Sequence, residues 1–188
     1  MDIEDPKANA LYLQLTVAGL LVYAVVYQAH AVAVGIARPK IFNKEFMAQF
    51  NQEHEKAFGK EAPLGGIPDD GNGYYADKLS YKDWYEFNNT QRAHINFLEH
   101  MGPTIFMTII TALRQPLWAM ITVWMLALGR VVYGCGYCKK GPHGRLVGAI
   151  MVDLALLGGL GGSIYTLATW SQVDGVISFG TQAIPKHA

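Results

Sequence analysis

Charged residues are scarce in this chain of 188 residues. They make up 16% of the sequence and hydrophobic residues 51%, whereas soluble domains contain roughly 25% charged residues. Two long stretches carry no charge at all: positions 8 to 37, and the residues between Asp153 and Asp174. A bilayer core about 30 Å thick is crossed by about 20 apolar residues in a helix. The sequence therefore predicts an integral membrane protein with two clear spans, at about residues 11–36 and 146–171.

Cysteine is sparse too, and clustered metal ligands and an excess of positive charge are missing. The only cysteines, Cys135 and Cys138, are too few for a disulfide framework, and we interpret them as small packing residues rather than a redox or metal motif. The six histidines are dispersed and predict no metal site. Fifteen basic residues balance fifteen acidic ones, so no surface for nucleic acid is expected. An acidic N-terminus before a long apolar run also argues against a cleavable signal peptide.

A third hydrophobic region, from Met101 to Val132, is interrupted once, at residues 114–116, which read Arg-Gln-Pro. Proline removes a helical hydrogen bond and clashes with the preceding turn. We therefore predict a tight turn between two antiparallel helices, at about residues 90–113 and 117–138. Each uncharged run is too short to cross a membrane alone, so both helices must draw charged residues into or against the membrane. Ionisable residues at that depth are costly and usually functional.

The polar segment at about residues 42–86 is interpreted as a loop insertion between the first two helices. The apolar residues within 42–58 are spaced for an amphipathic helix at the membrane surface. Twelve of the fifteen lysines and arginines lie in segments 38–92 and 130–145, so the positive-inside rule predicts that both charged loops are cytosolic. The predicted fold class is all-α: residues 1–188 form one integral membrane four-helix bundle.

The first polar motif lies at the start of the second predicted helix. Arg92, Asn96 and Glu99 are four and three residues apart and therefore share one helix face, whereas His94 lies on another. A face with a cation, an amide and an anion suits a zwitterionic, peptide-like ligand. The alternative is an interfacial Arg–Glu pair that only closes the bundle.

The second polar motif lies at the end of the third predicted helix. Arg130, Tyr133 and Tyr137 again share a face, although tyrosines at this depth also serve as interface anchors. On the last helix, Asp153 needs a partner, and Arg130 is the expected one. The glycine run at residues 158–162 lacks the lysine and serine of a phosphate loop and predicts a close helix contact instead.

The stretches at residues 91–99 and 129–137 resemble the second- and third-helix signatures of the MAPEG family, the membrane-associated proteins in eicosanoid and glutathione metabolism. Within the family they look most like the branch of microsomal glutathione transferase 3, and next like leukotriene C synthase. The resemblance covers the four predicted spans, and residues 45–81 look like an insertion. It implies a homotrimer in the endoplasmic reticulum or mitochondrial membrane, with glutathione as co-substrate between neighbouring subunits.

The resemblance also implies roles for individual residues. By motif position, the residues that would hold glutathione are Arg38, Arg92, His94, Asn96, Glu99, Tyr133 and Tyr137. Arg145 matches the arginine that activates the thiol. A cysteine thiol has a pKa of roughly 8.5, and a fixed cation nearby lowers it. Arginine suits this role because it stays charged in a low-dielectric site.

The activity that follows is that of a glutathione transferase or a glutathione-dependent peroxidase. Its second substrate would be a lipophilic electrophile or a lipid hydroperoxide that arrives through the membrane lipid. The alternative is a non-catalytic protein of the same fold, either an accessory protein or a structural subunit of a larger membrane complex. The long insertion would suit such a docking role.

Overall fold

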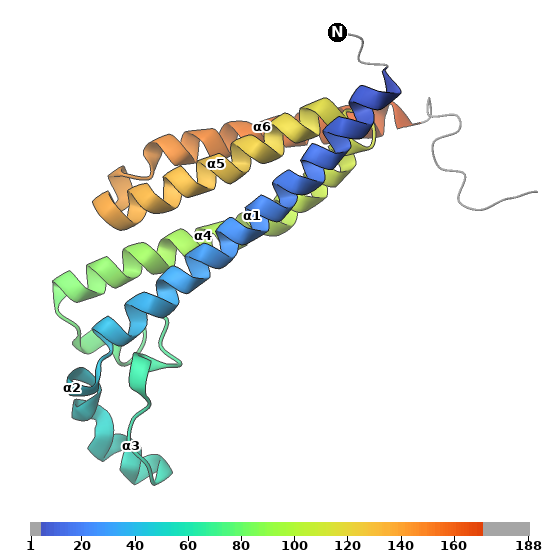
Figure 1. The fold of residues 1–188 in the computed structure, drawn as a ribbon. Helices are drawn as coiled ribbons and strands as arrows, with labels where there is room; N and C mark the ends of the chain where they lie inside the picture. The colour runs from blue at the N-terminus through green and yellow to red at the C-terminus, as the bar shows by residue number, and fades with distance from the viewer. Residues whose placement is uncertain (1–4, 171–188) are drawn as a thin grey trace, which may run out of the picture.

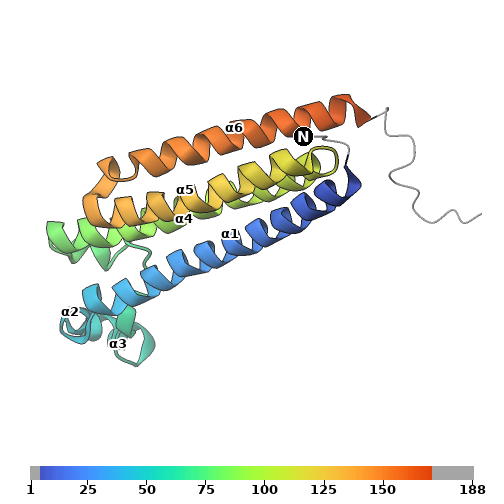
Figure 2. The same cartoon turned by 45° about the horizontal axis from the view of Figure 1, so that its top comes forward.

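Four long helices make up most of the structure, a computed structural model that describes residues 5–170. Their bounds are α1 Pro6–Ile41, α4 Tyr81–Ala112, α5 Pro116–Lys140 and α6 Leu146–Ala168. Helices α4 and α5 each contact the other three, and they lie between α1 and α6 (Figure 2). The predicted all-α class is confirmed, since no strand occurs within the described range.

Three of the long helices are apolar and long enough to cross a membrane: α1, α6, and α5 together with the turn that follows it. Helix α4 is not among them, although its 32 residues span about 48 Å. Its first half contains acidic residues and Arg92, which lower its hydropathy. Length and composition thus support three of the four predicted spans, and a crossing by α4 stays a prediction.

Two helices start earlier than the sequence pattern predicted, because polar side chains cap their starts, and α1 also ends later, at Ile41 rather than residue 36. In α1, which begins at residue 6 rather than 11, the Asp5 carboxylate accepts a hydrogen bond from the Lys7 N–H at 2.9 Å. In α4, which begins at residue 81 rather than 90, the Ser80 hydroxyl accepts from the Asp83 N–H at 3.1 Å. The segment predicted as the end of the loop is therefore the first part of α4.

The other two helices lie near their predicted positions. Helix α4 ends at Ala112 and α5 starts at Pro116, so the predicted turn lies between them. Helix α6 ends at Ala168, and position 171 of its predicted range lies outside the described residues.

The α5–α6 turn lies at the same end of the molecule as the insertion (Figure 1). The two lysine- and arginine-rich segments therefore share one end.

The insertion between α1 and α4 folds as a small unit at one end of the long helices (Figure 1), and its buried side chains share a core with α1 and α4. It contains α2 (Lys44–Met47), α3 (Asn51–Phe58) and three short 3₁₀ turns. The predicted amphipathic helix over residues 42–58 is present from Lys44 to Phe58, with a 3₁₀ turn at residues 48–50 between α2 and α3. Phe42 and Met47 are fully buried against Val34 of α1 and Phe87 of α4. These two side chains therefore do not face a membrane surface, whereas Phe58 at the end of the same segment is exposed.

Asp69 organises the second half of the insertion. Its carboxylate accepts hydrogen bonds from the backbone N–H groups of Gly71 (2.7 Å), Gly73 (2.9 Å) and Ala76 (2.8 Å). Burial opposes the charge, but these N–H groups outweigh it and hold the pKa of Asp69 below its ordinary value. Asn88 of α4 then donates to the Gly71 carbonyl at 2.8 Å, which fastens the insertion to the helix.

We expect Asp69→Asn to loosen the insertion, because the neutral amide replaces a charged acceptor. A hydrogen bond to a charged group contributes about 1.5–3 kcal/mol, so hydrogen exchange in residues 69–78 should accelerate about ten- to a hundredfold at neutral pH. The lowered pKa means that the wild-type advantage is complete above about pH 5, where the unfolded carboxyl is ionised as well, and is lost as the pH falls through the folded pKa. Asp70→Asn is the control, since Asp70 is exposed; equal exchange in the two variants would refute this role.

Helices α5 and α6 are in backbone contact at glycines. A Cβ atom on Gly148 would lie 2.2 Å from the Tyr133 backbone nitrogen, and one on Gly136 would lie 2.0 Å from the Gly144 carbonyl oxygen. Further along α6, a Cβ atom on Gly162 would lie 2.6 Å from the Thr111 side chain. The predicted close contact of the glycine run is therefore present, and a second one lies near the α5–α6 turn.

Gly148→Ala should force α6 away from α5. Inserting a methyl group into a closed contact costs about 1–3 kcal/mol, so the melting temperature in detergent should fall. Gly161→Ala is the matched control on the same helix, because a Cβ atom there has nothing within 4 Å. It should leave the melting temperature unchanged or raise it slightly. An equal effect of both substitutions would show that the contact at Gly148 is not tight.

Candidate functional site

Arg130 is buried among α4, α5 and α6, with 1% of its surface exposed. Its Nη1 donates to the Asn96 side-chain oxygen at 2.8 Å. The guanidinium also lies 4.8 Å from the centre of the Phe97 ring, a cation–π distance. The predicted pairing with Asp153 is not a direct ion pair: Asp153 lies on the exposed side of α6 and acts on the guanidinium only by a longer-range electrostatic interaction. Arg130 is therefore a buried link between α5 and α4.

Arg145 lies at the start of α6 and reaches back to two tyrosines of α5. Its Nη1 donates to the Tyr133 hydroxyl at 2.9 Å, and its guanidinium lies 5.4 Å from the centre of the Tyr137 ring. The hydrogen bond with Tyr133 raises the pKa of Arg145 above its ordinary value, so the side chain stays charged. Both tyrosines are buried and pack against Ala93 of α4. Arg145 is only partly buried.

The polar face of α4 is open in the single chain. Arg92 and Glu99 are exposed, and Asn96 between them is partly buried, with its oxygen bound to Arg130. His94 points elsewhere: its ring centre lies 5.1 Å from that of Tyr27 on α1. The helical spacing placed His94 on a different face, and its contact with α1 agrees with that.

Arg38 contacts the insertion. Its Nη1 donates to the Gly65 carbonyl at 3.2 Å, and its guanidinium lies 5.4 Å from the centre of the Phe87 ring. The resemblance implies a ligand for this side chain, whereas in the structure it joins α1 to the loop. Within the described residues of the single chain, these two contacts of Arg38 involve neither Arg145 nor the tyrosines at 133 and 137.

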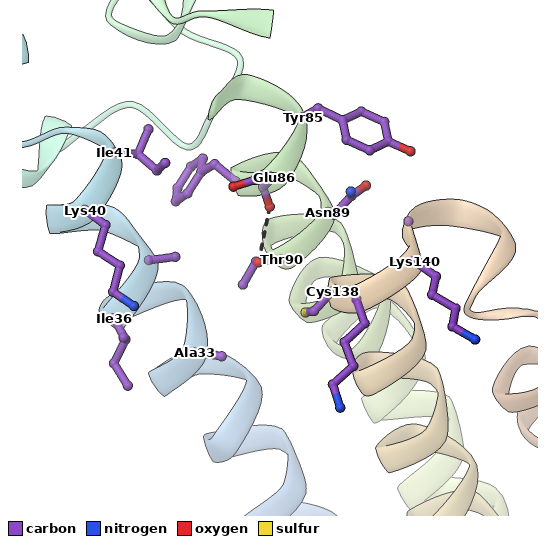
Figure 3. Close-up of a pocket in the computed structure, with 14 residues that line it drawn as sticks. Ala33, Ile36, Lys40, Ile41, Tyr85, Glu86, Asn89, Thr90, Cys138 and Lys140 are labelled. Carbon is purple, nitrogen blue, oxygen red and sulfur yellow. Dashed lines mark hydrogen bonds between the residues drawn. The ribbon is translucent and has the colours of Figure 1, made fainter. Parts of the chain in front are cut away.

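Two features were not foreseen from the sequence. The first is the bond between Arg130 and Asn96, which needs the relative rotation of two helices and has no signal in residue spacing. The second is a cavity of about 600 Å³ between α1, α4 and α5 (Figure 3). It is lined by none of the residues predicted to bind glutathione or to activate it.

The MAPEG family model matches residues 12–165, which include both polar motifs and Arg145. No curated protein is similar enough in sequence to count as a relative. The match covers most of the chain and agrees with the apolar helices that could cross a membrane. The chain therefore belongs to the MAPEG family of membrane proteins.

Proposed function

We propose that this chain is a membrane-bound glutathione transferase or glutathione-dependent peroxidase, most similar to the branch of microsomal glutathione transferase 3. It would cross the membrane four times, form a homotrimer in the endoplasmic reticulum or mitochondrial membrane, and keep both charged loops in the cytosol. The observation that carries the proposal is the partly exposed Arg145 guanidinium, held by the Tyr133 hydroxyl at 2.9 Å. A fixed cation of this kind stabilises a thiolate.

The charges on α4 complement those of glutathione. The tripeptide carries two carboxylates and one ammonium group, and Arg92 and Glu99 offer a cation and an anion on one exposed face. The Asn96 amide lies between them. In the single chain this face has no opposite wall, so a neighbouring subunit that covers it would complete the site. This openness supports the proposal of a homotrimer with glutathione between subunits.

The chemistry assigned to Arg145 is to lower the pKa of the glutathione thiol. With an electrophile, the thiolate forms a sulfur–carbon bond, and the leaving group departs with its electron pair. With a lipid hydroperoxide, the thiolate attacks one peroxide oxygen, the O–O bond breaks, and the lipid alcohol leaves after taking up a proton. The resulting sulfenic acid reacts with a second glutathione to give the disulfide and water. Tyr133 orients the guanidinium by accepting its hydrogen bond.

Arg92→Ala should weaken glutathione binding about ten- to a hundredfold, because a charged hydrogen bond contributes about 1.5–3 kcal/mol. Calorimetry on the purified protein in detergent measures this. Lys82→Ala is the matched control, since it removes an exposed cation from the first turn of the same helix. Unchanged affinity in a folded Arg92→Ala protein would remove α4 from the binding site.

Arg145→Ala should reduce turnover strongly and change glutathione affinity little, because the tripeptide is held mainly at α4. Raising the pH should partly restore the rate, since the thiol then ionises without the cation. Tyr133→Phe should give a smaller loss of the same kind. A pH–rate profile that does not change in Arg145→Ala would contradict the assignment.

A second candidate function is favoured by the folded insertion. The unit exposes large apolar side chains, with Phe58 70%, Leu64 65% and Ile67 60% exposed. Such a surface suits contact with another protein, as in a non-catalytic accessory protein or a structural subunit of a larger membrane complex. If the protein binds no glutathione, or binds it without a shift in the thiol pKa, this second function replaces the first.

A further inference from the structure

The cavity between α1, α4 and α5 has an apolar wall and a basic rim. Ala33, Ile36 and Ala37 of α1 form the apolar wall. Lys40 of α1 and Lys139 of α5 come from two different helices that line the opening. The cavity lies at the end of the molecule that carries the insertion, with Lys40 next to the opening (Figure 3).

Basic residues outnumber acidic ones around the opening of the cavity. Three lysines line the cavity, with Lys140 as the third, although Figure 3 shows its side chain directed away from the opening. Glu86 of α4 is the single acidic residue in this lining. The balance favours an anion. Because Glu86 partly opposes the lysines, a singly charged group such as a phosphodiester fits better than a small multivalent anion.

The depth of the cavity in a membrane follows from helix length. Helix α5 has 25 residues and spans about 37 Å, which exceeds a hydrocarbon core of about 30 Å. With Pro116 near one interface, Lys139 lies near the other, at the level of the lipid headgroups. Ala33 and Ile36 lie one to two turns before Lys40 on α1 and thus deeper, at the level of the acyl chains.

We propose that this cavity binds one anionic phospholipid. Its phosphate lies between Lys40 and Lys139, and one acyl chain runs along Ala33, Ile36 and Ala37. Basic pockets between transmembrane helices at a membrane surface bind such headgroups. The site is separate from the polar face of α4 and from Arg145, so it does not depend on the proposed glutathione chemistry. Bound lipid would brace α1 against α5 beside the insertion.

The two cysteines provide an internal reporter for occupancy. Both are exposed, but only Cys138 lines the cavity, and its sulfur is directed toward Thr90 (Figure 3). Cys135 lies one turn earlier on α5. A bound lipid should therefore slow the reaction of Cys138 with a maleimide, whereas the reaction rate of Cys135, one turn deeper in the membrane, should not depend on the lipid mixture.

The test compares the alkylation rates of the two thiols in the full chain, reconstituted in nanodiscs of phosphatidylcholine alone or mixed with phosphatidylglycerol. Occupancy slows alkylation by a factor of 1 + [L]/Kd, so near saturation we expect about a tenfold slower reaction at Cys138 only. Lys40→Ala/Lys139→Ala should remove this protection. Lys56→Ala/Lys60→Ala removes the same charge from the insertion and should keep it. If the double variant does not fold, the single variants Lys40→Gln and Lys139→Gln replace it, and each should lose part of the protection of Cys138.

Three results would overturn the proposal. Equal Cys138 rates in both lipid mixtures would show that the anionic lipid does not occupy the cavity. Equal protection in the Lys40→Ala/Lys139→Ala variant would show that the lysines do not hold it. Protection by inorganic phosphate, or by S-methylglutathione, which has no thiol to consume the maleimide, in phosphatidylcholine nanodiscs would identify a soluble anion as the occupant in place of a lipid.

Discussion

The contact between the backbones of α5 and α6 determines the geometry of the proposed site. Gly148 allows α6 to approach the Tyr133 backbone directly, and Arg145 precedes Gly148 by three residues. The approach of the two helices thus brings a guanidinium from one helix onto the tyrosine of the other, at 2.9 Å from its hydroxyl. A side chain at Gly148 would separate the helices, and Arg145 would lose its partner. The position of the Arg145 guanidinium therefore depends on the absence of a side chain at Gly148.

Arg130 provides the second constraint, because it joins the same region of α5 to α4. A buried guanidinium costs several kcal/mol to desolvate unless it is compensated. Compensation here comes from the Asn96 oxygen, the rings of Phe97 and Tyr133, and an electrostatic interaction with Tyr23. Its Nε and Nη2 atoms have no hydrogen-bond partner among the described residues. Because Asn96 lies between Arg92 and Glu99, the link fixes the rotation of α4 and so directs that exposed pair outward.

The sequence predicted relations within a helix better than relations between helices. Helical spacing alone separates His94 from the face of Arg92 and Glu99, and the structure agrees. The start of α4 was missed although Ser80 and Asp83 form a readable capping pattern. The partners of Arg130 and Arg38 could not be predicted. The partner of Arg130 depends on how α4 and α5 rotate relative to each other. The partner of Arg38 depends on the fold of the insertion, whose buried apolar residues follow no simple period.

The proposed catalysis depends above all on one event: glutathione becomes a thiolate when it binds beside Arg145. Calorimetry of glutathione binding to the wild-type protein at neutral pH, repeated in buffers of different ionisation enthalpy, counts the protons released on binding. A thiol pKa of roughly 8.5 in solution means that most free glutathione is protonated. We therefore expect the release of close to one proton per glutathione bound. Binding without proton release, or no binding, would contradict it.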